Sequence, residues 1–459
     1  MRILIGGLIL MKPKKHLSFS SLRKAFSKHL YNLAEHRQIS KTDYSIHDTM
    51  MSGFACMFFQ DPSLLQFQKR LKEKDNRDNL QTLFGVNNIP KDSQMRDVID
   101  EVDSEQLRPI VKDYFFRLQR GKHLEQKGIP PLEQYQVFPG LYMCSIDATQ
   151  YFSSKTVHCS NCLTTTHKNG EITYSHKVLQ AAIMHPDMRQ VIPLMPEEIR
   201  NGDGSVKQDC EINAAKRLIP KIREDHPQLG IIIVGDGLFS HQPTILNLLS
   251  ANMHYILVAK PDDHTYMMEW VEAYDKEEIG SIRTIDKKGR IHVYEWVNDV
   301  PLNGGENSIK TNFFRYKIIS KNKNGEEKIT YKNSWVTDLK ITESNIRTLV
   351  KAARCRWKIE NECFNTLKNQ GYHIEHNYGH GSENLCFNFF LLTLLAFYFH
   401  QIFELVDCAY QACRKKFGSK RNLWENLRVC IRILVFETWE HLLDFVLGPR
   451  KYRLVCQPL

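Results

Sequence analysis

The stretch Gly230-Ile-Ile-Ile-Val-Gly-Asp-Gly-Leu238 decides the fold. Its four consecutive β-branched residues are typical of a buried strand, and the two glycines around Asp236 mark where that strand ends. A helix is expected next, at about 243–251, followed by another strand at 255–259. Strands that alternate with helices in this way predict an α/β fold built on a sheet.

A second acid follows a similar pattern upstream. The β-rich run at 140–152 carries Asp147, and a strand at 174–184 and a helix at 209–224 complete the series before Gly230. Functional groups collect at strand ends in such sheets. An unpaired buried carboxylate is unfavourable unless a cation neutralises it or it caps a helix. Asp236 can therefore be a helix cap or turn residue, and Asp147 an ordinary acid at a strand end.

A third acid lies on a predicted helix that begins with Arg354-Cys-Arg-Trp-Lys-Ile-Glu-Asn-Glu-Cys-Phe364 and continues to Lys368. Arg356 and Glu360 are four residues apart and so share one helical face. The simplest interpretation is a surface salt bridge, worth about 0.3–0.5 kcal/mol. Between this helix and the sheet, a β-rich insertion is expected, with short strands at 282–285, 290–296, 313–320, 328–331 and 334–337.

The first third of the chain is expected to be all-α, with helices at 20–36, 42–59, 63–72, 79–84, 92–102 and 104–120. The first of these is a basic amphipathic helix, capped at Ser20 or Ser21, that carries Arg23, Lys24 and Lys28. It can be part of a DNA-binding module or simply the charged face of a helical domain. Near the other end, 384–403 is almost wholly apolar, and its polar interruptions favour a buried core helix over a membrane span.

Composition restricts the class of protein further. The 62 Lys and Arg outnumber the 52 Asp and Glu, a net charge of +10 that favours a polyanionic partner. The twelve cysteines show no disulfide framework and are expected to be reduced thiols of a cytoplasmic protein. The apolar residues 1–10 are expected to precede a true start at Met11, the alternative being a signal peptide.

Asp147, Asp236 and Glu360 together suggest a catalytic metal site. Three carboxylates can hold two Mg²⁺ ions about 3.5–4 Å apart, an arrangement that activates an attacking oxygen and stabilises the leaving one at a phosphodiester. No Walker loop and no serine or tyrosine recombinase motif is evident in the sequence. The pattern therefore favours an enzyme that cuts and joins DNA.

Four blocks carry a resemblance to a known family: Ser145-Ile-Asp-Ala-Thr149, Val234-Gly-Asp-Gly-Leu238, Ser334-Trp-Val-Thr-Asp338 and Arg356-Trp-Lys-Ile-Glu-Asn361. Over residues 140–400 the chain resembles DDE transposases of insertion sequences, in the group with a Tyr-Arg-Glu-Lys signature. Two signature positions differ. Ala353 stands at the tyrosine and Leu367 at the lysine, with Lys368 one residue beyond. Glu362, six residues before Lys368, is accordingly a rival third acid.

The resemblance implies a ribonuclease-H-like core interrupted by a β-rich insertion, with an all-α N-terminal domain and a helical C-terminal region. The expected divisions are a DNA-binding region at 1–135, core segments at 136–265 and 346–384, the insertion at 266–345 and the C-terminal region at 385–459. Asp147, Asp236 and Glu360 would be the catalytic residues and would bind two Mg²⁺ ions, for which Mn²⁺ can substitute. Arg356, Lys358 and Lys368 would contact DNA.

The same resemblance implies the reaction and the partners. Water would attack the phosphodiester at the element end, and the released 3′ hydroxyl would then attack target DNA. The partners would be double-stranded DNA, as terminal inverted repeats and target, and further copies of the chain in a homodimer or higher multimer at the nucleoid in the cytoplasm. The alternatives are a catalytically inactive DNA-binding regulator and a related metal-dependent nuclease.

One further cluster has the spacing of metal ligands. Cys159 and Cys162 form a Cys-x-x-Cys pair with His158, His167 and His176 nearby, as in zinc sites. A second Cys-x-x-Cys is missing, so the alternative of reduced structural cysteines stays open. Downstream, His373, His376 and His380 follow the Glu360 helix and are candidates for a DNA channel or for ordinary loop residues.

Overall fold

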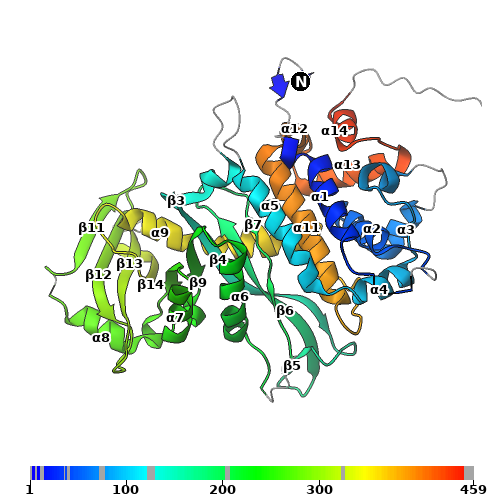
Figure 1. Cartoon of the computed structure of the whole chain (residues 1–459). Helices are drawn as coiled ribbons and strands as arrows, with labels where there is room; N and C mark the ends of the chain where they lie inside the picture. Colours follow the sequence, from blue (N-terminus) through cyan, green and yellow to red (C-terminus); the bar gives the residue numbers. More distant parts are fainter. Residues whose placement is uncertain are drawn as a thin grey trace, which may run out of the picture. The chain divides into compact units, whose positions relative to one another are not determined.

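The computed structural model of the protein describes residues 3–5, 8–10, 15–35, 37–38, 42–71, 78–120, 130–201, 207–275, 277–321 and 326–448 (Figure 1). Short strands β1 (Ile3–Ile5) and β2 (Leu8–Leu10) pair antiparallel near the start. Met11, the expected start of translation, lies outside the described residues.

The chain forms two compact units, and each is assembled from separate stretches of sequence. The helical unit contains Met1–Pro131, Gln150–His176 and Phe364–Leu459, and the sheet unit contains Leu132–Thr149 and Lys177–Cys363. The divisions expected from the sequence were contiguous ranges, whereas strands β4 and β6 each begin in one unit and end in the other. The structure is a mixed α/β fold, consistent with a ribonuclease-H-like transposase domain.

The sheet unit is built on a large mixed sheet. Its strands are β3 (Gln136–Phe138), β4 (Leu141–Ser154), β6 (Ile172–Met184), β7 (Ile192–Pro193), β8 (Glu197–Ile199), β9 (Gly230–Gly235), β10 (His254–Val258), β11 (Gly280–Ile285), β12 (Ile291–Pro301), β13 (Lys310–Lys321) and β14 (Glu327–Thr337). The strand order is β11-β12-β13-β14-β10-β9-β4-β6, with β3 on β4 and both β7 and β8 on β6. Strands β4, β9 and β10 are parallel, as the expected α/β core requires.

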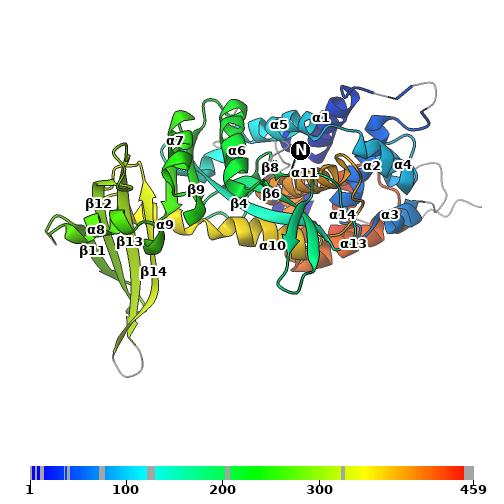
Figure 2. The same cartoon turned by 90° about the horizontal axis from the view of Figure 1, so that it is seen from below.

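Helices cover both faces of the parallel strands. The helices of the sheet unit are η5 (Pro131–Tyr135), α6 (Glu211–Asp225), η6 (Gly237–Phe239), α7 (Gln242–Ser250), η7 (Pro261–Asp263), α8 (Thr265–Ala273), α9 (Ile346–Arg354) and η8 (Ile359–Phe364). Figure 2 shows α6 and α7 on one side of β4 and β9, and α9 on the other. Because β9 is enclosed in this way, Ile231 to Val234 are all buried, as the unbroken apolar run predicts.

The β-rich segment before Glu360 is a four-stranded antiparallel meander, β11 to β14. The two strands expected at 328–331 and 334–337 are one strand, β14, which pairs with β13 along its length. Lys332 and Asn333 interrupt the apolar pattern there, but backbone pairing does not require apolar side chains. The expectation of two strands is therefore wrong.

The helical unit gathers helices from both ends of the sequence. They are η1 (Lys15–Leu17), α1 (Phe19–Tyr31), α2 (Ile46–Phe58), α3 (Leu64–Leu71), η3 (Leu80–Phe84), α4 (Asp92–Asp100), η4 (Ser104–Leu107), α5 (Arg108–Gln119), α10 (Asn365–Asn369), α11 (Leu385–Val406), α12 (Cys408–Phe417), α13 (Lys420–Ile433) and α14 (Trp439–Leu447). Strand β5 (Leu163–Thr166) pairs with the first part of β6. Helix α1 is capped by Ser18, two residues earlier than expected, because Phe19 is buried in the core as part of the helix.

Helix α11 is the centre of the helical unit. It is long and apolar enough to cross a membrane, but every residue from Phe387 to Phe403 is buried. Phe399 contacts Phe54 and Phe58 of α2, and Phe403 stacks on Trp439 of α14. The helix is thus buried as a core helix is, and the sequence favoured that interpretation.

Candidate active site

Asp147 lies on β4, and Asp236 directly follows the neighbouring parallel strand β9 at the corresponding position. Ser145 of β4 pairs with Val234 of β9, and the two acids follow two residues later on each chain segment. Asp236 also caps η6, since its Oδ1 accepts the N–H of Leu238 at 2.9 Å. The cap considered from the sequence is confirmed, and a carboxylate retains further acceptor capacity beyond this one bond.

Arg356 connects the helix acid to a strand acid. Its Nη1 lies 2.7 Å from Glu360 Oε1 and 3.4 Å from Asp147 Oδ2. The predicted contact between Arg356 and Glu360 is therefore present. Arg356 also contacts Asp147, so the interaction is not confined to the surface of one helix. The guanidinium joins the segment after α9 to strand β4.

The environment of Asp147 disfavours its negative charge. Burial raises the pKa of its carboxyl to about 6, and the charges of Glu360 and Asp236 act in the same direction. Arg356 and the N–H of Ala148, at 2.9 Å, oppose this rise but do not cancel it. Glu360 and Asp236 are therefore both close enough to interact with Asp147, and Asp147 is best accommodated when a proton or a cation neutralises it.

The backbone around Glu360 is not the regular helix that the spacing predicts. Helix α9 ends at Arg354, and η8, from Ile359 to Phe364, is π-helical. A π-turn holds one residue more than an α-turn, so the residues after it are displaced by one position around the helix. The displacement turns Leu367 into the core, where it is 1% exposed, whereas the Lys368 side chain is 27% exposed.

Two other acids from the sequence analysis are engaged elsewhere. Glu362 lies 3.5 Å from Arg189 Nε, not on Arg356. Asp338 receives hydrogen bonds from the His254 ring at 2.6 Å and the Tyr255 N–H at 3.0 Å. Asp338 thus fixes the end of β14 to the start of β10, which is a structural role.

Lys358, expected to contact DNA, is directed into the sheet unit. It is 8% exposed, and its ammonium donates to the backbone carbonyls of His185, Pro186 and Met188 at 2.9, 2.8 and 2.5 Å. Three bonds match the three protons of an ammonium group. Of the cations expected to bind DNA, Lys358 is accordingly the least accessible.

The remaining predicted DNA ligands differ in exposure. Lys24 and Lys28 are exposed on α1, whereas Arg23 is half-buried and its burial lowers its pKa. Lys368 forms an ion pair with Glu375 at 2.8 Å. Lys24 and Lys28 are thus the more available of the basic residues on the first helix.

Glu211 is an acid near the site that no sequence pattern marked. This acid lies in the first turn of α6, where burial raises its pKa and the charge of Asp236 raises it further. Lys177 of β6 opposes the rise. Glu211 is therefore a fourth carboxylate within electrostatic range of Asp236. Its place at a predicted helix start gave no signal of this proximity.

A groove beside the candidate site combines cations with aromatic rings. Its volume is about 480 Å³, and its lining includes Tyr294, Tyr316, Arg347, Lys351, Arg354 and Trp357. The Arg354 guanidinium lies 5.4 Å from the centre of the Tyr316 ring and 4.7 Å from that of Tyr331. Basic side chains interleaved with aromatic ones suit a nucleic acid strand.

The donor set suits a hard divalent cation, because carboxylate oxygens are the ligands that Mg²⁺ and Mn²⁺ prefer. Asp147 gains most from such a cation, since its surroundings disfavour the uncompensated charge. Among the described residues, the three acids are not a cluster whose ligand atoms all lie within 4.8 Å of one another. Two of them, Asp147 and Glu360, instead share a contact with the Arg356 guanidinium.

Comparison with known families agrees with this geometry. Residues 203–398 match the family model described as a transposase DDE domain, a range that includes Asp236 and Glu360. The match supports a DDE-type transposase. The match suggests a nuclease or transferase enzyme and supports a role in transposition and DNA recombination. A search of curated proteins found no match.

Proposed function

We propose that this transposase cleaves the ends of its own element and transfers them to target DNA, with Asp147, Asp236 and Glu360 as the catalytic carboxylates. One observation carries the assignment. Arg356 contacts both Asp147 and Glu360, and Asp236 directly follows β9 at the position that corresponds in register to Asp147 of β4. Acids that are far apart in the sequence thereby converge on one edge of the sheet.

The carboxylates would hold two Mg²⁺ ions, or Mn²⁺ in their place, which supply Lewis-acid activation of the attacking water and stabilisation of the leaving oxygen. The protein's own contribution is to fix the ligands. β4 and β9 hold two acids rigidly in parallel register, and the π-turn presents the third. The raised pKa of Asp147 reflects a site arranged for added positive charge.

Arg356 would act as a positioning residue that also senses DNA. In the structure its guanidinium balances Asp147 and Glu360. The planar Arg356 guanidinium can bind an anionic DNA phosphate in place of the carboxylates. Divalent cations would then neutralise the carboxylates. We expect DNA and metal to displace Arg356 from the carboxylates together.

We place the chain in the group with the Tyr-Arg-Glu-Lys signature, with Lys368 in the lysine role. The π-turn supports this assignment, because the displacement by one position puts residue 368 where residue 367 would lie in an unbroken α-helix. Ala353, at the tyrosine position, is 2% exposed, so a tyrosine there would need a different local packing.

Double-stranded DNA is the proposed partner, both as terminal inverted repeats and as target, with the chain acting as a homodimer or larger multimer. Lys24 and Lys28 on α1 supply exposed positive charge in the helical unit. In the sheet unit, the groove that contains Arg354 and Trp357 supplies cations and rings. The net charge of +10 favours the same partner.

The test is a nicking assay with the purified chain, Mg²⁺ and a duplex that carries the element end. Asp147→Asn, Asp236→Asn and Glu360→Gln should each lower the nicking rate by at least about 1,000-fold while DNA binding is retained. Glu362→Gln is the matched control and should nick normally.

Two results would change the assignment. If Glu362→Gln abolished nicking and Glu360→Gln did not, the third acid would be Glu362. If the unaltered chain bound element ends but never nicked them with Mg²⁺ or Mn²⁺, the inactive regulator would replace the transposase.

A further inference from the structure

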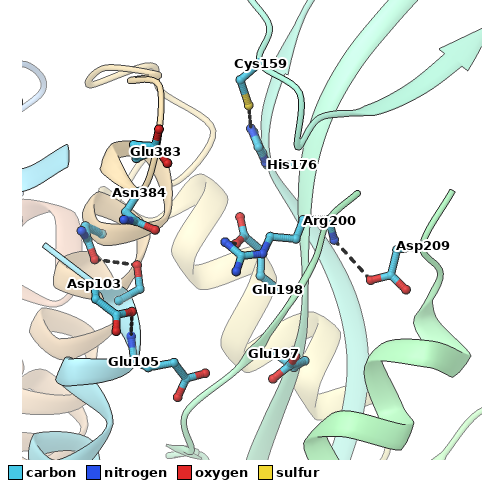
Figure 3. Close-up of polar contacts among 12 residues, drawn as sticks. Asp103, Glu105, Cys159, His176, Glu197, Glu198, Arg200, Asp209, Glu383 and Asn384 are labelled. Atoms are coloured by element: carbon cyan, nitrogen blue, oxygen red, sulfur yellow. Dashed lines mark hydrogen bonds and ion pairs between the residues drawn. The ribbon is translucent and has the colours of Figure 1, made fainter. Parts of the chain in front are cut away.

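Four side chains of the helical unit, none of them among the proposed catalytic acids, converge on one point. They are Cys159, Cys162, His176 and His380, and their sulfur and nitrogen atoms all lie within 4.8 Å of one another. All four are buried or partly buried. Figure 3 shows Cys159 directed at the His176 ring, with the contact between them dashed.

The distances between these atoms are those of a tetrahedron of zinc ligands. The two Sγ atoms are 3.9 Å apart, and His176 Nε2 lies 3.6 and 3.3 Å from them. His380 Nε2 lies 3.4 Å from Cys162 Sγ and 3.2 Å from His176 Nε2. With Zn–S near 2.3 Å and Zn–N near 2.05 Å, ideal tetrahedral edges are about 3.8 Å for S–S, about 3.6 Å for S–N and about 3.4 Å for N–N.

The hydrogen bonds around the cluster prepare its atoms for a metal. His380 Nδ1 lies 2.8 Å from the Gly381 carbonyl, and since only an N–H can donate to that oxygen, Nε2 is left as the unprotonated nitrogen. The backbone N–H of Cys159 points at Cys162 Sγ at 3.5 Å. The two Sγ atoms are well beyond the roughly 2.05 Å of a disulfide.

The backbone that carries His380 is built to hold it in place. Gly379 and Gly381 have φ values of 151° and 71°, and a Cβ on Gly381 would lie 2.4 Å from Asp100 Oδ1. Asp100 in turn accepts the backbone N–H groups of Ser382, Glu383, Asn384 and Leu385. Phe152 packs 4.6 Å from the His380 ring. The histidine is therefore fixed by its surroundings.

We propose that Cys159, Cys162, His176 and His380 bind one structural Zn²⁺ ion that fastens the hairpin segment, residues 150–176 with strand β5 and the first part of β6, to the segment before α11. Two thiolates and two imidazoles form a soft and borderline donor set that selects zinc over the magnesium expected at the carboxylates. Because the chain supplies all four ligands, the site is closed and therefore structural, not catalytic. The inference does not depend on the transposase assignment.

The test is metal analysis of the full chain, expressed with zinc in the medium and purified without chelator. We expect about one zinc per chain and, after exchange with Co²⁺, the visible absorption of a tetrahedral site with thiolate ligands. Cys162→Ser and His380→Ala should lose the metal. His380→Cys, which restores a ligand, should keep it with a stronger thiolate band. His158→Gln and Cys210→Ser change exposed residues of the same types outside the cluster and should bind zinc normally.

A second readout does not require the variants to fold. Treating the unaltered chain with a chelator should lower its melting temperature and speed tryptic cleavage after Lys155 and Lys168, which are exposed in the hairpin. Added zinc should reverse both effects. Substoichiometric zinc in the unaltered chain, unchanged zinc content in Cys162→Ser and His380→Ala, or a Cys159–Cys162 disulfide found by mass spectrometry would each overturn the proposal.

Discussion

Replacing Asp147 by asparagine should stabilise the metal-free protein at alkaline pH. Burial, together with Glu360 and Asp236, raises the pKa of Asp147 from an ordinary value of 3.8 to about 6. A pKa that is higher by about 2 in the folded chain corresponds to about 3 kcal/mol between the two protonation states. Asparagine has the shape of the neutral acid but carries no charge. It therefore removes the free-energy cost of the buried carboxylate at any pH at which Asp147 would be ionised.

The sign of the pH dependence follows from the direction of that change. A raised folded-state pKa gives stability that is fully present below the unfolded pKa and is lost as the pH rises through about 6. Asp147→Asn should therefore be more stable than the unaltered chain by about 3 kcal/mol at pH 8 and by well under 1 kcal/mol at pH 4. For a chain of this size the difference at pH 8 is a rise of about 3–6 °C in melting temperature.

The assay is thermal unfolding in EDTA at both pH values, with Asp262→Asn as the control. Asp262 is an exposed acid of the same unit, and its replacement should have no effect at either pH. A variant at position 147 that melts lower than the unaltered chain at pH 8 would refute the reasoning. A gain of equal size at pH 4 and pH 8 would refute it as well.

Other replacements test the contacts that shape the two units. Asp100→Ala should destabilise the helical unit by about 2–4 kcal/mol in thermal melts, because four backbone N–H groups lose a charged acceptor, whereas Asp97→Ala on the exposed face of the same helix should be neutral. Lys358→Met should destabilise the sheet unit by about 2–3 kcal/mol, since three partly buried carbonyls lose their charged donor. A neutral result would mean that water replaces the ammonium. Arg356→Gln should lower the nicking rate at least about 100-fold, because Glu360 loses its link to Asp147. It should also raise the Mg²⁺ concentration needed for the half-maximal rate, and an unchanged Mg²⁺ dependence would argue against a positioning role.

Local patterns predicted most elements of the fold. An element that is buried on one or both sides needs apolar residues at its buried positions, so its pattern is visible in the sequence. This holds for the apolar run that follows Gly230 and for the apolar positions of α1, α2 and α11. The cap of α1 was expected at Ser20 or Ser21 and not at Ser18, because Phe19 belongs to the core and not to the loop. Strand β14 was divided in two because pairing with β13 tolerates the polar residues in its middle.

The candidate site was predicted in part, and for a related reason. Asp147, Asp236 and Glu360 could be chosen because each follows or belongs to a recognisable element, whereas Glu211 approaches Asp236 only through the packing of α6 on the sheet. His176 and His380 are 204 residues apart, and their 3.2 Å contact exists only after the helical unit has assembled. The π-turn at Glu360 is equally invisible in the sequence, because its residues have ordinary helix preferences.

The discontinuous helical unit has a consequence for synthesis on the ribosome. Phe54 and Phe58 need α11 as their packing partner, yet that helix follows the entire sheet unit in the sequence. The N-terminal helices therefore leave the ribosome early and wait with exposed aromatic surface until translation is nearly finished, a state that chaperones bind and proteases remove. The sheet unit, complete at Cys363, can fold first. A product truncated before α11 would lack this packing partner and should be degraded.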